Sequence, residues 1–173
     1  MTSPKALHNP KKAPISLRDG CLEDKEHLIS WLKEPDVLNW YPMYNDAEIQ
    51  DAANYWISFA EKKALLVAEY EGIPCGLVNL YLQSSKKLAH HALLAIIVSE
   101  KLRGKGVGTA LLEGIKQRAK ETFRMEMLLL EVYDKNPAIR LYERCGFRKY
   151  GFQKQFIREP NQYVGKHLMQ LDL

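Results

Sequence analysis

The feature that most constrains this chain is a glycine-rich segment, Arg103 to Gly108 (RGKGVG), that joins an apolar run to an amphipathic one. The preceding run, residues 93–98, is apolar at both alternating positions, which predicts a central strand covered on both faces of a sheet. The following run, residues 107–121, repeats apolar residues at helical spacing. Its buried stripe should consist of Leu111, Leu112, Ile115 and Ala119. The chain is therefore expected to pass from a buried strand almost directly into a helix.

A glycine-rich joint between a strand and a helix favours an anionic ligand. Backbone N–H groups at a helix N-terminus have no partner within the helix, and glycine lets the backbone approach a ligand closely. The helix dipole adds positive potential, and the side chains of Arg103 and Lys105 add full charges. The segment therefore predicts a phosphate or pyrophosphate site. The alternative is a structural glycine turn that binds nothing.

Two common phosphate-binding fingerprints do not fit this segment. A dinucleotide fingerprint, G-x-G-x-x-G, counted from Gly104 has Thr109 at its third glycine. Counted from Gly106, it has Leu111 there. The P-loop pattern ends in Gly-Lys-Ser/Thr, whereas here Lys105 precedes Gly106. Both motifs also require a preceding βαβ unit, which the pattern upstream of the loop does not predict.

The periodicity of the remaining sequence predicts one mixed α+β domain over residues 14–173, after a polar, disordered tail at 1–13. Before the loop we expect a strand at 15–18, a helix at 22–33, a helix capped by Asn45 or Asp46, and an antiparallel meander of strands at 64–70, 75–83 and 88–98. After it we expect a helix at 107–121, a strand at 127–133, a short helix between Asn136-Pro137 and Gly146, and a hairpin of 147–157 and 163–171 with its turn at 158–162.

Composition excludes several classes of protein. The net charge is +4 and the isoelectric point about 8.9, but the basic residues are scattered, so we expect no nucleic-acid partner. No apolar run reaches membrane-spanning length, and the N-terminus lacks the apolar segment of a signal peptide. Three widely spaced cysteines indicate reduced thiols in a cytoplasmic protein, and the five histidines do not fall at metal-ligand spacing with them. We expect no metal and no membrane partner.

The strand, loop and helix, IIV-SEKL-RGKGVG-TALL, resemble the acetyl-coenzyme A (acetyl-CoA) motif R/Q-x-x-G-x-G/A of the GNAT superfamily of N-acetyltransferases. Arg103, Gly106 and Gly108 occupy its fixed positions. The resemblance implies a mixed, mostly antiparallel sheet of about six or seven strands flanked by about four helices. It implies that the pantetheine arm is bound by the backbone of Ile96, Ile97 and Val98. The pyrophosphate would be bound by Arg103, Gly104, Lys105, Gly106, Val107, Gly108 and Thr109.

A second segment, NPAIRLYERCGF at 136–147, resembles the family signature N-x-x-A-x-x-x-Y-x-x-x-G-F. Tyr142, Gly146 and Phe147 keep the spacing of that signature. Asn136 lies six residues before the tyrosine, where the family has seven. Asn136 could therefore bind the pantetheine or simply cap the short helix.

Transfer of an acetyl group from a thioester to an amine requires a base for the amine, N–H donors for the oxyanion and an acid for the thiolate. By the resemblance, Tyr142 is the acid and the amide of Val98 meets the oxyanion. Glu131, in an otherwise apolar strand, matches a catalytic glutamate of ribosomal-protein acetyltransferases and is the candidate base. The alternative is that Glu131 is a salt-bridged strand residue. His90 and His91 are second-rank candidates for the base.

The acceptor amine is less constrained. The first two helices and the last hairpin should surround it, and their aromatic residues either line the acceptor site or belong to the core: Trp40, Tyr41, Tyr44, Trp56, Phe156 and Tyr163. Glu34, Asp36 and Asp46 could attract a cationic acceptor. The leading hypothesis is an acetyl-CoA-dependent N-acetyltransferase that acts on a primary amine. A homodimer is compatible with this sequence. The alternatives are a non-catalytic coenzyme A-binding regulatory domain and a nucleotide- or RNA-binding module.

Overall fold

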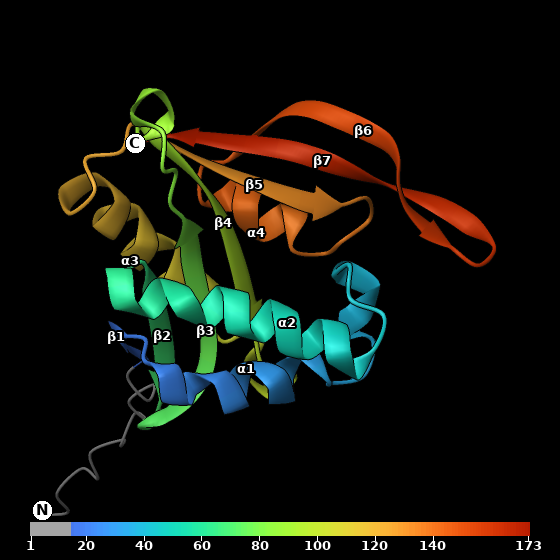
Figure 1. Ribbon diagram of the computed structural model, residues 1–173, viewed down its shortest axis with the longest axis horizontal. Helices are drawn as coiled ribbons and strands as arrows, with labels where there is room; N and C mark the ends of the chain where they lie inside the picture. The colour runs from blue at the N-terminus through green and yellow to red at the C-terminus, as the bar shows by residue number, and fades with distance from the viewer. Residues whose placement is uncertain (1–14) are drawn as a thin grey trace, which may run out of the picture.

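In the computed structural model, which describes residues 15–173, a single seven-stranded sheet has the order β1-β2-β3-β4-β5-β7-β6 (Figure 1). The expected tail at 1–13 lies outside the described residues. The strands are β1 (Ile15–Asp19), β2 (Leu65–Tyr70), β3 (Ile73–Tyr81), β4 (His91–Val98), β5 (Met127–Tyr133), β6 (Arg148–Glu159) and β7 (Gln162–Asp172). The helices are α1 (Lys25–Leu32), α2 (Asp46–Ile57), α3 (Val107–Glu121) and α4 (Ile139–Arg144). The predicted α+β class with a mixed, mostly antiparallel sheet is confirmed.

Most of the predicted elements are confirmed, several with the same bounds. The helix at 107–121 and the strand at 127–133 begin and end where the sequence pattern placed them. The Asn45 side chain accepts a hydrogen bond from the backbone N–H of Glu48, so it caps α2 as expected. The predicted turn at 158–162 is too long, because β6 extends to Glu159 and β7 begins at Gln162. Two residues suffice to join strands whose ladder hydrogen bonds continue into the turn.

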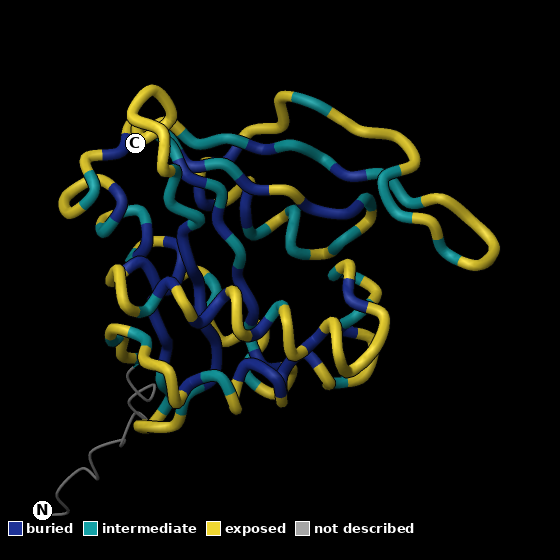
Figure 2. The backbone as a smooth tube through the Cα atoms, in the orientation of Figure 1, coloured by how far each residue is buried: buried dark blue, intermediate teal, exposed yellow. Residues whose placement is uncertain are grey.

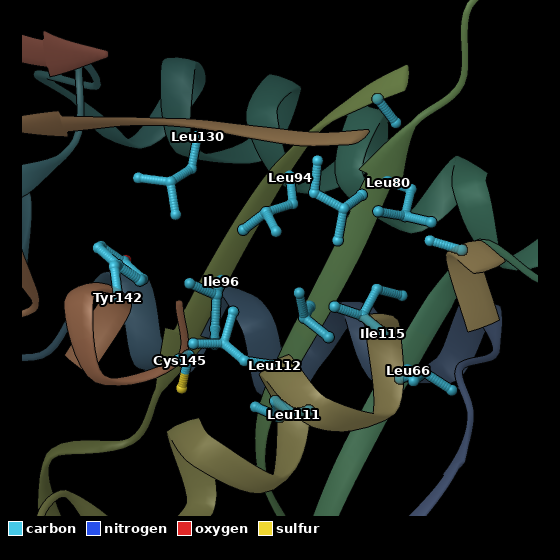
Figure 3. Close-up of a cluster of buried hydrophobic side chains, with 14 of the residues drawn as sticks. Leu66, Leu80, Leu94, Ile96, Leu111, Leu112, Ile115, Leu130, Tyr142 and Cys145 are labelled. Carbon is cyan, nitrogen blue, oxygen red and sulfur yellow. The ribbon is translucent and has the colours of Figure 1, made fainter. Parts of the chain in front are cut away.

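Two different cores cover the two faces of the sheet (Figure 1). Leu111, Leu112 and Ile115 of α3 pack on one face against a cluster that includes Ile96 and Tyr142 (Figure 3). Helices α1 and α2 pack on the other face against a cluster that includes Ile97. Consecutive residues of β4 therefore enter opposite cores, which confirms the predicted central strand. Burying each such aliphatic side chain contributes about 1.5–3 kcal/mol.

The sheet opens between β4 and β5, and this opening positions the site. The two strands are parallel but pair only at His91 with Met127, Ala92 with Leu128 and Leu93 with Leu129. Beyond Leu93, β4 continues to Val98 and β5 to Tyr133 without pairing to each other. The backbone N–H groups of β4 that face this opening consequently have no partner on β5 and are available to a ligand.

The β6–β7 hairpin differs from the rest of the sheet in its exposure. Strand β6 is the edge strand and is exposed over most of its length, as is the tip of the hairpin (Figure 2). Strand β7 lies between β5 and β6 and buries Lys166 and Met169. The register of the hairpin shifts between Gln153 and Ile157, where β6 bulges. No helix among residues 15–173 is long and apolar enough to span a membrane.

Candidate active site

A cavity of about 480 Å³ lies along the end of β4 that is not paired to β5, and no residue of β5 lines it. It is bounded by β4, the glycine loop, the start of α3, the segment before α4, α4 itself and the short 3-10 helix η2 (Val37–Trp40) with Tyr41 after it. Most of the predicted site residues line it: Ile96, Ile97, Val98, Arg103, Gly104, Gly106, Gly108, Thr109, Asn136 and Tyr142. The fold thus brings together segments that are as much as 107 residues apart in sequence, from Val37 to Arg144.

The backbone of β4 presents alternate residues to this cavity. The N–H of Ser99 bonds to the carbonyl of Cys75 on the β3 side. Because an antiparallel ladder bonds every second residue to a given neighbour, Ile97 also turns its backbone groups toward β3, whereas Ile96 and Val98 turn theirs toward the opening. The carbonyl of Ile96 accepts a hydrogen bond of 2.7 Å from the hydroxyl of Tyr41. The carbonyl of Val98 accepts one of 3.2 Å from Nε of Arg103.

The glycine loop has the backbone conformation that an anion site needs. Gly104 and Gly106 have φ of 73° and 92°, in the region that favours glycine. The first bond of α3 runs from the N–H of Ala110 to the carbonyl of Gly106. The N–H groups of the first turn of α3 are therefore left without intrahelical partners at the positive end of a 15-residue helix. A Cβ at Gly104 would meet no atom within 4 Å, so space for a ligand lies beside the backbone.

These features fit the pyrophosphate and pantetheine of coenzyme A. The unpaired N–H groups and Arg103 suit a diphosphate, and the free edge of β4 suits an amide-containing arm that runs along it. Gly108 lies where a Cβ would come within 2.7 Å of Leu141, so this position also sets how closely α3 packs against α4. The residues present are thus compatible with the predicted ligand.

Two of the predicted cofactor-binding side chains point elsewhere. The ammonium of Lys105 lies 5.5 Å from the centroid of the Tyr70 ring, outside the lining of the cavity. Val107 is 1% exposed and belongs to the core. Only the backbone of these two residues is placed to serve the loop.

Arg103 connects the glycine loop to the end of α1. Its guanidinium lies 3.7 Å from the carboxylate of Glu34, which also accepts a hydrogen bond from the N–H of Glu100. Glu34 was a candidate for attracting a cationic acceptor, but in the structure its carboxylate is bound to the loop. Glu34 therefore holds Arg103 and the N–H of Glu100 in place at the wall of the cavity.

Tyr142 lies in α4, is 8% exposed and lines the cavity. Burial raises the pKa of its hydroxyl, so the phenol stays protonated at neutral pH. Among the described residues its hydroxyl has no hydrogen-bond partner, which leaves it available to a ligand. Gly146 has φ of 96° and ends α4 as expected. Asn136 accepts a hydrogen bond of 2.9 Å from the N–H of Ala138, so it does cap this turn while lining the cavity.

Glu131 is not part of the cavity lining. It lies on β5, and its carboxylate is 2.5 Å from the ammonium of Lys166 on β7. Lys166 is 6% exposed and lies 3.7 Å from the centroid of the Phe156 ring. Tyr133 is also buried, and its hydroxyl has no hydrogen-bond partner within residues 15–173. Burial, with the nearby carboxylates of Glu159 and Glu131, raises the pKa of Tyr133 to about 12.

The sequence reasoning did not single out Lys166 or Tyr133. A lysine that shares a face of β7 with Val164 and Leu168 was a signal that the sequence offered. The aromatic residues that were candidates for the acceptor site lie in different environments. Trp40 and Tyr41 line the cavity and Trp56 is in the core, while Tyr44 is 83% exposed. Tyr163 is half exposed at the hairpin and contacts Arg158.

The other candidates lie away from the cavity. His90 and His91 contact each other at the start of β4, and His91 Nδ1 is buried with no hydrogen-bond partner from residue 15 onward. Cys75 and Cys145 are buried free thiols, and burial raises their pKa. Within residues 15–173, no group of three or more His, Cys, Asp or Glu side chains is placed to hold a metal ion.

Comparison with known proteins provides independent evidence for the family of this chain. Residues 26–147 match the sequence profile of the family described as the acetyltransferase (GNAT) family. The chain is 28% identical over 105 residues to the L-amino acid N-acetyltransferase AaaT of Escherichia coli, covering 60% of this chain and 65% of that protein. It is 37% identical over 97 residues to an N-alpha-acetyltransferase of Sulfurisphaera tokodaii, covering 50% of this chain and 57% of that protein. It therefore spans less than two thirds of both relatives.

The fold has close counterparts among solved structures. The yncA protein of Salmonella typhimurium, solved with its cofactor acetyl-CoA, superposes with a TM-score of 0.77. The superposition covers 92% of this chain and 94% of that one, at 20% sequence identity. At this identity the likeness establishes the fold: the seven-stranded sheet with its flanking helices is shared with that protein.

Proposed function

The chain belongs to the acetyltransferase (GNAT) family, and on that premise we propose that it transfers an acetyl group from acetyl-CoA to a primary amine. The observation that carries the proposal is the cavity at the β4–β5 opening. There a free strand edge, a positive-φ glycine loop and a protonated buried tyrosine converge. Acetyl-CoA supplies the activated acetyl group, and the protein supplies binding, orientation and proton transfer.

The donor would be bound mainly by backbone. The N–H groups at the start of α3, with Arg103 beside them, suit the pyrophosphate, and the free edge at Ile96 and Val98 suits the pantetheine. Ile97 would line the cavity without bonding to the pantetheine through its backbone, because its backbone groups turn toward β3. Such preformed contacts orient the thioester before the amine arrives, which lowers the entropic part of the barrier.

Three groups would carry the proton and charge changes of the reaction. The N–H of Val98 faces the opening and can donate to the thioester oxygen as that atom gains charge. Tyr142 would donate its proton to the sulfur as the C–S bond breaks. Glu131, across the opening on β5, would accept the proton that the amine loses as the N–C bond forms.

The names of the two relatives, an L-amino acid N-acetyltransferase and an N-alpha-acetyltransferase, support an α-amine as the acceptor. Trp40 and Tyr41 line the cavity on the side of the first helix pair and would shape the entry of the amine. The buried free thiols Cys75 and Cys145 support a reducing compartment, and we propose the cytoplasm.

Two measurements test this function in sequence. Isothermal titration with acetyl-CoA should show binding, and acceptor-dependent release of free thiol should show turnover. No binding at millimolar acetyl-CoA would reject the proposal. Binding without turnover across amino acids, peptides, polyamines and aminoglycosides would instead indicate a non-catalytic coenzyme A-binding domain.

A further inference from the structure

A cluster of polar and aromatic side chains lies on β5, β6 and β7, on the opposite side of the opening from the free edge of β4. It consists of Glu131, Tyr133, Lys166 and Phe156. Tyr133 and Lys166 are direct partners in the antiparallel β5–β7 ladder, so their side chains share one face of the sheet. Glu131 lies two residues before Tyr133 and therefore points to the same face. The ring of Phe156 contacts Tyr133 and Lys166. Its centroid lies 6.0 Å from the centroid of the Tyr133 ring and 3.7 Å from the Lys166 ammonium.

The donors of this cluster exceed the acceptors that the protein supplies. Lys166 is 6% exposed and has three N–H donors, yet its one hydrogen-bond partner among the described residues is Glu131. Tyr133 is 7% exposed, and in the described part of the chain its hydroxyl has no hydrogen-bond partner. Buried polar groups are almost always hydrogen-bonded, and the rare exceptions mark places where a water, an ion or a ligand belongs. The spare donors point to a ligand group that accepts hydrogen bonds.

Charge selects the kind of ligand. Glu131 and Lys166 neutralise each other, so a ligand with a single charge would leave a net charge beside the Lys166 ammonium, whose side chain is only 8% exposed, whereas that of Glu131 is 39% exposed. A ligand with one positive and one negative group keeps the cluster neutral. Its ammonium can bind the carboxylate of Glu131, and its carboxylate can bind the spare donors of Lys166 and Tyr133.

We therefore propose that the acceptor is a free amino acid, with its carboxylate held by Lys166 and Tyr133 and its amine held at Glu131. This inference rests on the proposed acetyl transfer and narrows it to one class of amine. Glu131 lies on the part of β5 that has separated from β4, so an amine bound there is beside the opening in which the thioester would lie. The cluster binds the acceptor from the side opposite the donor.

The same arrangement disfavours the other acceptors. A polyamine would bring only positive charge toward the buried ammonium of Lys166 and would leave the Tyr133 hydroxyl without an acceptor. The N-terminus of a peptide has an amide carbonyl where the free amino acid has its carboxylate, so it would lose the charged part of the contact. Hydrogen bonds to charged groups are worth more than those between neutral groups, which predicts at least about a tenfold preference for the free acid.

The test compares acids with their own amides. The protein saturated with coenzyme A, and the protein alone, are titrated calorimetrically with the common L-amino acids, their α-amides, spermidine and a tripeptide amide. The best free acid should bind at least tenfold more tightly than its amide and than spermidine. Equal affinity for acid and amide, a preference for spermidine, or no binding of any amino acid would each overturn the proposal.

Two variants locate the effect. Tyr133→Phe removes only the orphan hydroxyl, and Lys166→Met removes the cation while keeping a side chain of similar length. Both should lose most of the acid-over-amide preference and leave acetyl-CoA affinity unchanged. Tyr150→Phe and Lys149→Met are matched controls on β6, because Tyr150 is exposed and Lys149 is half-exposed beside Glu143. A preference retained in both cluster variants would place the carboxylate elsewhere and overturn the proposal.

This binding test is separable from the catalytic proposal. A protein that binds amino acids in the expected order but releases no thiol retains the acceptor site and refutes the proposed activity. A protein that acetylates amides and spermidine as fast as amino acids retains the activity and refutes the acceptor class. Circular dichroism of each variant shows that a lost preference does not come from a lost fold.

Discussion

The two sides of the β4–β5 opening are built from different parts of the chain. The β4 side, residues 96–98 and 103–109, presents backbone N–H and carbonyl groups whose positions follow from a strand edge, positive φ angles and a helix N-terminus. The β5 side presents the side chains of Glu131, Tyr133, Lys166 and Phe156, which long-range strand pairing brings together. Backbone groups, as on the β4 side, suit a ligand that is always the same. Side chains, as on the β5 side, can be changed to suit different acceptors.

The largest effect should come from a change that destroys the backbone geometry of the β4 side. In Gly106→Val, a β-branched residue would occupy a φ of 92° at a position that lines the cavity. We expect acetyl-CoA affinity to fall by more than about 100-fold, since the loop must either distort or exclude the ligand. Isothermal titration measures the loss.

A matched control separates strain from binding in that experiment. Gly72, in the turn between β2 and β3, has φ of 78° and open space around it. Gly72→Val should lose a similar amount of stability, about 1–3 kcal/mol, and keep its acetyl-CoA affinity. Equal affinities for both variants would show that the donor does not bind at the glycine loop.

The second-largest effect should be on kcat, from a change at Tyr142. Tyr142→Phe removes the hydroxyl proposed to protonate the departing sulfur and keeps the ring that packs beside Phe147. We expect kcat to fall by about 10²-fold, the lower end of the range for general acid catalysis, with acetyl-CoA affinity unchanged. Single-turnover thiol release measures the chemical step directly. An unchanged rate would remove Tyr142 from the acid role.

The sequence predicted the β4 side far better than the β5 side, and the reason is physical. The bounds of α3 and β5, the loop and the cap at Gly146 all follow from local patterns of apolar residues and glycine. The pairing of Glu131 with Lys166 joins residues 35 apart and depends on the register of β5 with β7, which no local pattern specifies. The sequence therefore singled out Glu131 but could not identify Lys166 as its partner, and the ion pair agrees with the alternative that Glu131 is a salt-bridged strand residue.

Local charge was also a poor guide to where a side chain points. Lys105 was expected to add charge at the loop, but its long aliphatic chain lets the ammonium reach Tyr70 instead. Glu34 was expected to face the acceptor, but it is bound to Arg103 and to the N–H of Glu100. In both cases a partner from a distant element decides the orientation.

A smaller effect should follow from a side chain that supports the free edge of β4. Tyr41→Phe removes the hydrogen bond from its hydroxyl to the carbonyl of Ile96. We expect a loss of about 0.5–1.5 kcal/mol in the free energy of unfolding, measured by urea denaturation. Tyr44→Phe is the control, since Tyr44 is 83% exposed and its change should have no measurable effect. Equal stability of the two variants would show that the Tyr41 contact adds nothing net.

The smallest effect tests whether the β4 side works through backbone rather than surface charge. Lys105→Ala should weaken acetyl-CoA binding by no more than about threefold at physiological salt, because its ammonium packs on Tyr70 and exposed charges are screened within about 8 Å. Arg103→Ala should cost about tenfold or more, because its guanidinium lines the cavity and bonds to the carbonyl of Val98. Titrations at low and physiological ionic strength should show salt sensitivity for the Lys105 effect alone. If both substitutions cost the same at physiological salt, Lys105 must leave Tyr70 to reach the ligand, and the β4 side would then rely on mobile side chains as much as on its backbone.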